Sequence, residues 1–390
     1  MIRFITAGES HGKCLTGILE GLPAGLPVSA EAIDLQLRRR QVGYGRGGRM
    51  RIERDEIEIT AGVRHGRTLG GPVSFVIQNR DWSHWRIAMS VEPVEEDANV
   101  RPITRPRPGH VDLAGALKYG TYDSRDVLER ASARETAARV AGGSFCRVLL
   151  EAFGIRIGSH VVAIGTEHVS GEYENLEPGK IMEIDPFSPM RCADAAAESR
   201  MKALIDRAKE MGDTIGGVAE IVASPVPPGL GSHTQWDRRL DGRIALCMMS
   251  IPAAKAVEIG SGIEASASFG SAVHDEIFYD RERRRFFRET NRAGGIEAGI
   301  SNGGDIRVRL YVKPIPTLRK PLRSVDLRTK EPFEAAFERS DTCVVPAAAV
   351  IGEAMLALAL AEAFMEKFGG DSIAETRSNF EQYLRSLEQY

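Results

Sequence analysis

The most apolar stretch of the chain, from Cys343 to Ala361, limits what the protein can fold into more than any other segment. It is long enough either to cross a bilayer or to form a long buried helix. Pro346 and Glu353 interrupt it, and alanine makes up much of it, which disfavours a membrane span. We therefore predict a helix over residues 340–368 that lies in a globular core, and no membrane partner.

The composition supports a globular protein with a sizeable core. Of the 390 residues, 43% are hydrophobic and 27% are charged, which is near the globular average. The chain has 51 Lys and Arg against 54 Asp and Glu, giving a formal charge of −3. Because affinity for a phosphate backbone needs a basic surplus, this balance argues against a nucleic-acid partner. Without a low-complexity linker or a visible repeat, we expect one integrated α+β domain over residues 1–390.

The N-terminus and the cysteines bear on the compartment. The first residues, MIRFITAGESHG, lack the apolar core and the small-residue cleavage site of a signal peptide. The five cysteines are scattered, with no CxxC pair and no histidine at metal-ligand spacing. We therefore expect a cytoplasmic protein with reduced thiols and no metal site.

Local patterns predict a mixture of strands and helices. Strands are expected on both sides of the loop GESHG and in GPVSFVIQN at 71–79. The Arg-rich segment 281–289 is typical of a solvated hairpin. Gly142 and Gly143 lie inside an Ala-rich helical pattern, which indicates close approach of another backbone. Further helices are expected over residues 29–40, 126–153, 194–211 and 236–254, and a strand beyond a Gly-rich loop over 295–311.

Arginines gather beside loops rich in glycine or proline, although the net charge is nearly zero. Guanidinium groups bind phosphate and carboxylate in a bidentate manner, so converging loops of this kind would form a pocket for a small polyanion. Surface solubility is the alternative, and it fits Arg38, which should point away from Arg40 on a helix. The clustered residues are Arg38, Arg39, Arg40, Arg46, Arg49, Arg51, Arg101, Arg105, Arg107, Arg130, Arg134 and Arg139.

Two histidines are candidates for proton transfer. His11 and His110 each follow Ser or Gly in a Gly-containing loop near arginines, and histidine titrates near neutrality. The alternative for each is a hydrogen-bonded structural residue. Ser10 beside His11 does not indicate a Ser/His hydrolase, because adjacent residues of an extended segment point to opposite faces and no GxSxG motif is present. GYGRGG matches GxGxxG, but it follows a helix and precedes a strand, the reverse of a dinucleotide-binding site.

A series of motifs, in order along nearly the whole chain, resembles the chorismate synthase family. Several of them are long and chemically unusual, so chance similarity is remote. The motifs are GESHG (8–12), RRRQVGYGRGGRM (38–50), RPGH (107–110), ASARET (131–136), GDTIGG (212–217), MSIPAAKAVEIG (249–260), GGIEAGISNGG (294–304), KPIPT (313–317) and RSD (339–341).

The resemblance implies a lyase that converts 5-enolpyruvylshikimate 3-phosphate to chorismate and phosphate by 1,4-elimination. It implies reduced FMN as a cofactor, required without net redox change and supplied by an external flavin reductase. The fold that it implies is a β-α-β sandwich with a helical core between the sheets, assembled as a homotetramer. Substrate and FMN together carry two phosphates and two carboxylates, which the arginine loops could hold.

The resemblance also implies roles for particular residues. His11 would act at the departing phosphate, His110 would supply a proton to the flavin, and Asp341 would lie beside flavin N5. The substrate or NADP would be bound by Arg40, Arg46, Arg49, Arg107 and Arg134. The flavin would be bound by Arg130, Ala131, Ser132, Pro252, Ala253, Ala298, Lys313, Pro314, Ile315, Pro316, Thr317 and Arg339.

Three positions depart from the family pattern. The family often has Ser at Ala131, Asn at Pro252 and Gly at Ala298, so contacts there rest on the backbone or are absent.

Two other function classes remain open. A flavoprotein oxidoreductase would use the same anion pocket while consuming NAD(P)H. An RNA-binding module would use the Arg/Gly segments, but aromatic content is only 6% and few aromatic residues lie among them.

Overall fold

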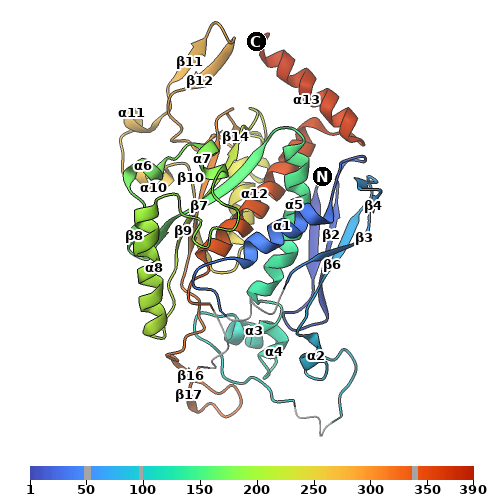
Figure 1. The fold of residues 1–390 in the computed structure, drawn as a ribbon, viewed down its shortest axis with the longest axis vertical. Coiled ribbons are helices and arrows are strands. Elements are labelled where there is room, and N and C mark those ends of the chain that lie inside the picture. The colour runs from blue at the N-terminus through green and yellow to red at the C-terminus, as the bar shows by residue number, and fades with distance from the viewer. Residues whose placement is uncertain (48–53, 96–99, 336–340) are drawn as a thin grey trace.

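Two antiparallel sheets enclose a layer of helices (Figure 1). The computed structural model describes residues 1–47, 54–95, 100–335 and 341–390. The first sheet has the order β1-β2-β6-β3, formed by β1 (Arg3–Ala7), β2 (Cys14–Glu20), β6 (Val73–Gln78) and β3 (Ile57–Ala61). The second has the order β10-β15-β9-β7-β8, formed by β10 (Ala254–Ile259), β15 (Ile306–Val312), β9 (Gly217–Ser224), β7 (Arg156–Ile164) and β8 (Glu167–His168).

The helices between the sheets are α1 (Ala30–Gln41), α5 (Thr136–Glu151), α9 (Leu240–Met249) and α12 (Val345–Phe368). Helix α5 contacts β1, β2 and β6 of the first sheet, and α12 contacts β7, β9 and β15 of the second. Because α5 and α12 also pack on each other, their side chains join the two sheets in one hydrophobic cluster. The expected α+β class and the β-α-β sandwich with a helical core are confirmed.

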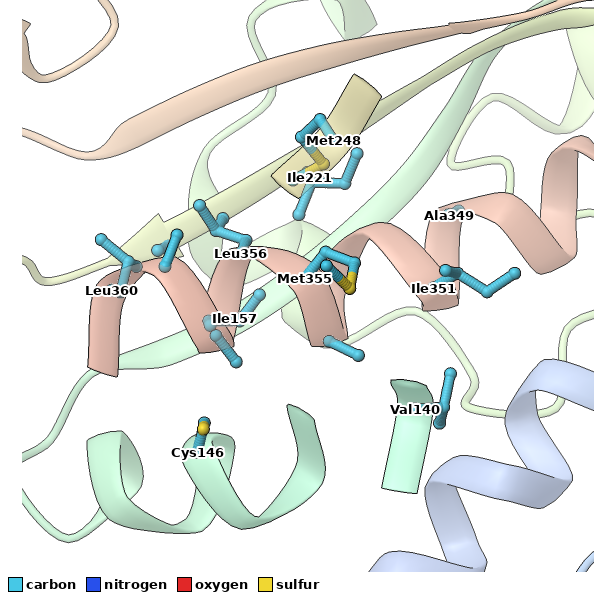
Figure 2. Packing of buried hydrophobic residues seen from close by; sticks show 14 of the residues in the cluster. Val140, Cys146, Ile157, Ile221, Met248, Ala349, Ile351, Met355, Leu356 and Leu360 are labelled. Carbon is cyan, nitrogen blue, oxygen red and sulfur yellow. The ribbon is translucent and has the colours of Figure 1, made fainter. Parts of the chain in front are cut away.

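Helix α12 is the core helix that the apolar stretch predicts. It starts at Val345, five residues later than expected, with Pro346 in its first turn, where a missing N–H costs no hydrogen bond. In its most apolar window, 89% of the residues are buried inside the protein. Figure 2 shows Leu356 and Leu360 directed toward the second sheet, while Cys146 of α5 lies on the opposite side of α12.

The paired glycines of α5 mark two close approaches, as predicted. A Cβ on Gly142 would lie 2.4 Å from the ring of Phe4 in β1. A Cβ on Gly143 would lie 2.4 Å from the carbonyl oxygen of Ala354 in α12. Glycine at these two positions lets α5 contact a strand on one side and a helix on the other.

Several element boundaries differ from the sequence-based expectations. The helix expected over 236–254 is shorter: Trp236–Arg238 form a 3-10 turn, α9 ends at Met249, and β10 begins at Ala254. The segment 295–311 holds one pair of two-residue strands, Ile296–Glu297 and Ile300–Ser301, before β15, since Gly299 turns the chain between them. Among the remaining elements described are β4 (Val63–Arg64), β5 (Arg67–Thr68), α2 (Trp82–Trp85), α3 (Asp112–Tyr119), α4 (Arg125–Leu128), α6 (Gly171–Glu174), α7 (Pro178–Met182), α8 (Ala195–Glu210), α10 (Gly262–Ser266), α11 (Gly270–Val273), β11 (Ile277–Asp280), β12 (Arg285–Arg288), β13 (Ile296–Glu297), β14 (Ile300–Ser301), β16 (Arg323–Val325), β17 (Pro332–Glu334), α13 (Ile373–Leu387) and the 3-10 turns Ala133–Glu135 and Trp236–Arg238.

The hairpin of β11 and β12 and the helix predicted from Ser29 are confirmed. The hairpin side chains are mostly exposed, and Figure 1 shows it projecting from one end of the molecule. Ser29 caps α1 by accepting a hydrogen bond from the N–H of Ala32 at 3.1 Å. Helices α2, α3 and α4 lie near the opposite end from the hairpin (Figure 1), beside the loop that joins β1 to β2.

Candidate functional site

His11 lies in the loop between β1 and β2 and is held by a buried carboxylate. Its Nδ1 is 2.9 Å from Oε2 of Glu129, and its backbone N–H donates to the same oxygen at 2.9 Å. The ring stacks on Trp85 of α2 with centroids 3.9 Å apart. Because Nδ1 faces the carboxylate, Nε2 is the nitrogen left to act on a ligand, and it has no protein partner in the described part of the chain.

The charge of Glu129 is favoured by its neighbours. Burial alone would raise the pKa of Glu129, but hydrogen bonds and charge from His11, together with the charge of Arg125, outweigh burial and lower it. Arg125 donates to Glu129 Oε1 at 2.9 Å and lies 5.0 Å from the Trp85 ring centroid. Glu129 therefore stays a carboxylate that can orient His11 and stabilise its protonated ring.

Arg40 and Arg134 converge on one buried carboxylate beside this loop. Arg134 forms a close hydrogen bond to Asp55, and Nη1 of Arg40 is 3.8 Å from Asp55 Oδ2. Arg134 Nε also donates to Asn79 at 2.9 Å, and Asn79 donates to the carbonyl of Gly12 at 2.7 Å. The arginines predicted from the 38–50 and 131–136 motifs are thus tied to the His11 loop.

Arg46 and Asp341 extend this cluster. Arg46 Nη1 is 2.8 Å from Asp341 Oδ2, and the N–H of Gly47 donates to Asp341 Oδ1 at 2.6 Å. Burial lowers the pKa of Arg40 to about 10; the charges of Arg46 and Arg134 act in the same direction, although Asp55 opposes them. Among the described residues, this cluster brings three guanidinium groups together with two carboxylates, and guanidinium groups can hold an anion.

His110 repeats the arrangement seen at His11. Its Nδ1 forms a close hydrogen bond to Asp112, whose side chain is fully buried at the start of α3. Arg107 donates to Asp112 from Nε at 2.8 Å and to the hydroxyl of Thr317 at 3.2 Å. Burial would raise the pKa of Asp112, but hydrogen bonds from His110 and Arg107 and their charges lower it well below its usual range. The Nε2 of His110 is left without a partner among the residues described.

Lys313 brings the end of β15 to the His110 loop. Its Nζ donates to the carbonyl of Gly109 at 2.6 Å. Burial lowers the pKa of Lys313, and the charge of Lys255 acts in the same direction. Gly109 has a φ of 79°, where glycine is favoured, and a Cβ there would contact Lys313 and Pro316. Lys313 therefore places one positive charge beside the His110 loop.

Two of the predicted flavin-binding residues adjoin the His11 loop. Arg130 donates to the carbonyl of Thr6 at 2.9 Å and to that of Gly8 at 3.2 Å. The hydroxyl of Ser132 donates to the hydroxyl of Ser10 at 3.1 Å. Ala131 lies between them and offers only backbone groups for polar contacts.

The other predicted flavin-binding residues do not all lie beside the 313–317 segment. Pro252 and Ala253 end the turn after α9, and the carbonyl of Ala253 accepts from the N–H of Lys313 at 2.9 Å, so they adjoin the 313–317 segment. Ala298 lies in the β13–β14 turn near the start of α9, so ten helical residues, or about 15 Å, separate it from that segment. Arg49 and Arg339 lie outside the residues that the structure describes.

Three side chains that contact the two histidines were not predicted from the sequence. Glu129 and Asp112 hold the rings, and Trp85 stacks on one of them. Asp112 carries a usable signal, since it follows His110 by two residues. Glu129 is 118 positions from His11, so only the tertiary fold reveals their contact.

The geometry suits a ligand that carries several negative charges and undergoes proton transfer. Gly115 of α3 lies against Val127 of α4, so the His110 loop is joined to the helix that precedes Glu129. Two histidines whose Nε2 atoms have no partner among the described residues, together with clustered arginines, can bind anions and stabilise a leaving phosphate. Among the described residues, no group of three or more His, Cys, Asp or Glu side chains could hold a metal ion.

Comparison with known proteins identifies related chains. The family model described as chorismate synthase matches residues 2–365. A chorismate synthase from Solibacter usitatus (strain Ellin6076) is 55% identical over 392 residues and covers 100% of both chains. One from Aquifex aeolicus (strain VF5) is 54% identical, covering 100% of this chain and 99% of the relative. A solved structure described as a crystal structure of chorismate synthase superimposes with a TM-score of 0.80 at 45% identity, covering 100% of this chain and 99% of the other.

Proposed function

Since this chain belongs to the chorismate synthase family and is therefore a lyase, we propose that it converts 5-enolpyruvylshikimate 3-phosphate to chorismate and inorganic phosphate. In this anti-1,4-elimination the bond from C3 to the phosphate oxygen breaks, a proton leaves C6, and a second ring double bond forms. The reaction is the last common step of the shikimate pathway, which leads to the aromatic amino acids.

The observation that carries the proposal is the pairing of His11 with Glu129 and of His110 with Asp112 beside a cluster of arginines. A protonated His11 would donate from Nε2 to the departing phosphate. His110 would hold a proton at Nε2 next to the cofactor. Asp341, held by Arg46 and the N–H of Gly47, would accept a proton near the same place.

Reduced FMN fits the residues present. Lys313, whose charge is disfavoured by burial and by Lys255, would be stabilised by an anionic cofactor. Arg107 and Thr317 lie beside Lys313, and Arg130 and Ser132 adjoin the His11 loop. When bound, the reduced flavin supplies electron density to the substrate as phosphate leaves, with no net redox change.

The arginine cluster would bind the substrate. Arg40, Arg46 and Arg134 lie with Asp55 and Asp341 in one cluster, where the guanidinium groups would hold a phosphate or carboxylate of the substrate. Bidentate guanidinium contacts would fix the substrate in one orientation. Arg49 and Arg339 are included in this proposal from the motif alone.

The domain organisation, cellular location, assembly and electron source of the enzyme are also proposed. We infer a single domain over residues 1–390, a cytoplasmic location, a homotetramer and an external flavin reductase as the source of electrons. No dinucleotide fingerprint occurs in a strand-to-helix context, which favours the external reductase over an oxidoreductase that consumes NAD(P)H.

An anaerobic assay tests the function. Purified protein, chemically reduced FMN and 5-enolpyruvylshikimate 3-phosphate are mixed, and phosphate release, chorismate absorbance and flavin oxidation are followed together. We expect equal amounts of phosphate and chorismate without flavin oxidation. His11→Ala and His110→Ala should depress turnover about 100-fold while leaving FMN binding largely intact, and the exposed His233→Ala should behave as wild type. Absence of product, or full activity in both variants, would refute the assignment.

A further inference from the structure

A cavity with a volume of about 310 Å³ lies between α1, α5, β7 and the segment 181–191. Its lining includes no residue of the clusters around His11 and His110. The volume is at the lower end of the range for small-molecule sites. The lining combines apolar side chains with arginines: the apolar residues include Leu35, Val148, Ile157, Ile181 and Met182, and the arginines are Arg39, Arg147, Arg156 and Arg191.

Three of these arginines surround one buried carboxylate. Glu353 of α12 is 2% exposed and is 2.6 Å from Arg39, 2.8 Å from Arg147 and 3.1 Å from Arg191. Glu151 pairs with Arg147 at 2.9 Å from the outer side. The four lining arginines therefore exceed Glu353 and Glu151 by two positive charges. Asp185, which is exposed near Arg191, does not reverse this sign.

Two of the arginines have side-chain donors that no described protein group uses. Arg191 is 3% exposed, and its buried Nε has no hydrogen-bond partner in the part of the chain described. The side chain of Arg156, at the exposed start of β7, forms no hydrogen bond or ion pair with any described residue. Because a buried unpaired donor costs free energy, Arg191 would gain from an acceptor.

The backbone of Arg191 is also held in an unusual state. Its φ of 54° lies in the left-handed region, which non-glycine residues rarely adopt. Hydrogen bonds to the carbonyls of Pro186 and Ser159, and the ion pair with Glu353, hold the side chain at the cavity. Burial lowers the pKa of Arg191 to about 10, and the charges of Arg39 and Arg147 act in the same direction, although Glu353 opposes them.

From this geometry we propose that the cavity binds a small organic anion with an apolar body, separate from the site around His11 and His110. The anionic head would lie against Arg156 and Arg191, and the body would lie against Leu35, Ile157 and Met182. A guanidinium group binds a carboxylate in a bidentate manner, and the apolar wall gains from leaving water.

Isothermal titration calorimetry with the full-length protein and benzoate tests this site. Wild type should bind benzoate saturably, whereas benzyl alcohol, which lacks the charge, and inorganic phosphate, which lacks the apolar body, should bind at least about tenfold more weakly. Ala32, on the exposed side of α1, lines the cavity, so Ala32→Trp should fill its mouth and weaken benzoate binding about tenfold. Arg156→Ala should do the same by removing the unpaired charge.

The matched control is Ala30→Trp, which places the same side chain on α1 at an exposed position outside the cavity. It should leave benzoate affinity within about twofold of wild type. Benzoate binding that Ala32→Trp and Arg156→Ala leave unchanged would mean that benzoate binds elsewhere and would overturn the proposal. So would phosphate binding as tight as that of benzoate, or no saturable benzoate binding by wild type.

Discussion

At the two histidine centres, a buried carboxylate decides which ring nitrogen can do chemistry. Glu129 holds Nδ1 of His11, and Asp112 holds Nδ1 of His110, so Nε2 is the free atom in both rings. A carboxylate in this position fixes the tautomer and stabilises the protonated ring. The same pairing in two loops far apart in the sequence gives the molecule two positions that can hold a proton at Nε2.

Replacing Glu129 with Gln tests the positioning role. The amide keeps the size but removes the charge that stabilises protonated His11, so kcat should fall about 100-fold while KM for the enolpyruvyl substrate changes little. The pH profile of kcat should also shift, because the negative charge beside the His11 ring would be removed. Glu183→Gln, at an exposed site, is the control. Wild-type kcat and an unmoved pH profile would show that Glu129 is only structural.

Ala298 stores backbone strain that glycine would release. Its φ is 49°, where a Cβ costs about 1–2 kcal/mol. Ala298→Gly should therefore raise the free energy of unfolding by about 1 kcal/mol, measured by urea denaturation. Ala256→Gly in β10, where φ is ordinary, should instead lower it by about 0.5–1 kcal/mol. Equal effects of the two substitutions would contradict the argument.

At the scale of elements, the contact between α5 and α12 depends on a missing side chain. A Cβ at position 143 would meet the Ala354 carbonyl at a distance that real Cβ atoms do not show, so the helices would have to separate. Gly143→Ala should cost about 1–3 kcal/mol of stability in urea denaturation, despite the gain in helix propensity. Gly179→Ala in α7 meets nothing within 4 Å and should be neutral or slightly stabilising. A neutral Gly143→Ala would refute the close packing.

Periodic and capped elements are predictable from the sequence, whereas elements defined by partners are not. The Ser29 cap, the apolar run of α12 and the glycine pair of α5 each carry their own local signal. Strand β7 and helix α13 were not predicted. The pairing of β7 with β9 reaches 68 residues along the chain from Arg156 to Ser224, which no short window contains.

The candidate site shows the same limit. His11, His110 and the arginines stand out because they lie in unusual Gly- or Pro-rich loops. Their carboxylate partners are ordinary residues of short helical segments, and their importance comes from burial and contact. The distance of Ala298 from the 313–317 segment also depends on the length of α9, a property of the folded chain.

At the scale of the whole molecule, Glu353 links parts that are distant in sequence. Its carboxylate accepts hydrogen bonds from Arg39 of α1, Arg147 of α5, Arg191 and Ser159 of β7. The carboxylate of Glu353 thereby connects α12 to α5, to α1 and to the second sheet. Burial would raise the pKa of Glu353, but the charges of Arg39, Arg191 and Arg147 and their hydrogen bonds lower it well below its usual range.

This charge makes stability depend on pH in a defined direction. Because the folded-state pKa of Glu353 lies below the ordinary value of 4.5, its contribution is fully present above about pH 4.5 and is lost as the pH falls through the folded value. Glu353→Gln leaves three arginines around a neutral group and should cost about 3–5 kcal/mol near pH 7, measured by urea denaturation. At about pH 3.5 the gap between wild type and variant should narrow by about 1 kcal/mol or more.

The control is Glu183→Gln, which removes an exposed carboxylate and should leave the free energy of unfolding within about 0.5 kcal/mol of wild type at both pH values. A gap for Glu353→Gln that stays the same at both pH values would mean that the carboxylate titrates alike in the folded and unfolded chains. The three arginines would then stabilise the fold by their packing, and the charge of Glu353 would not be what joins α12 to α1, α5 and β7.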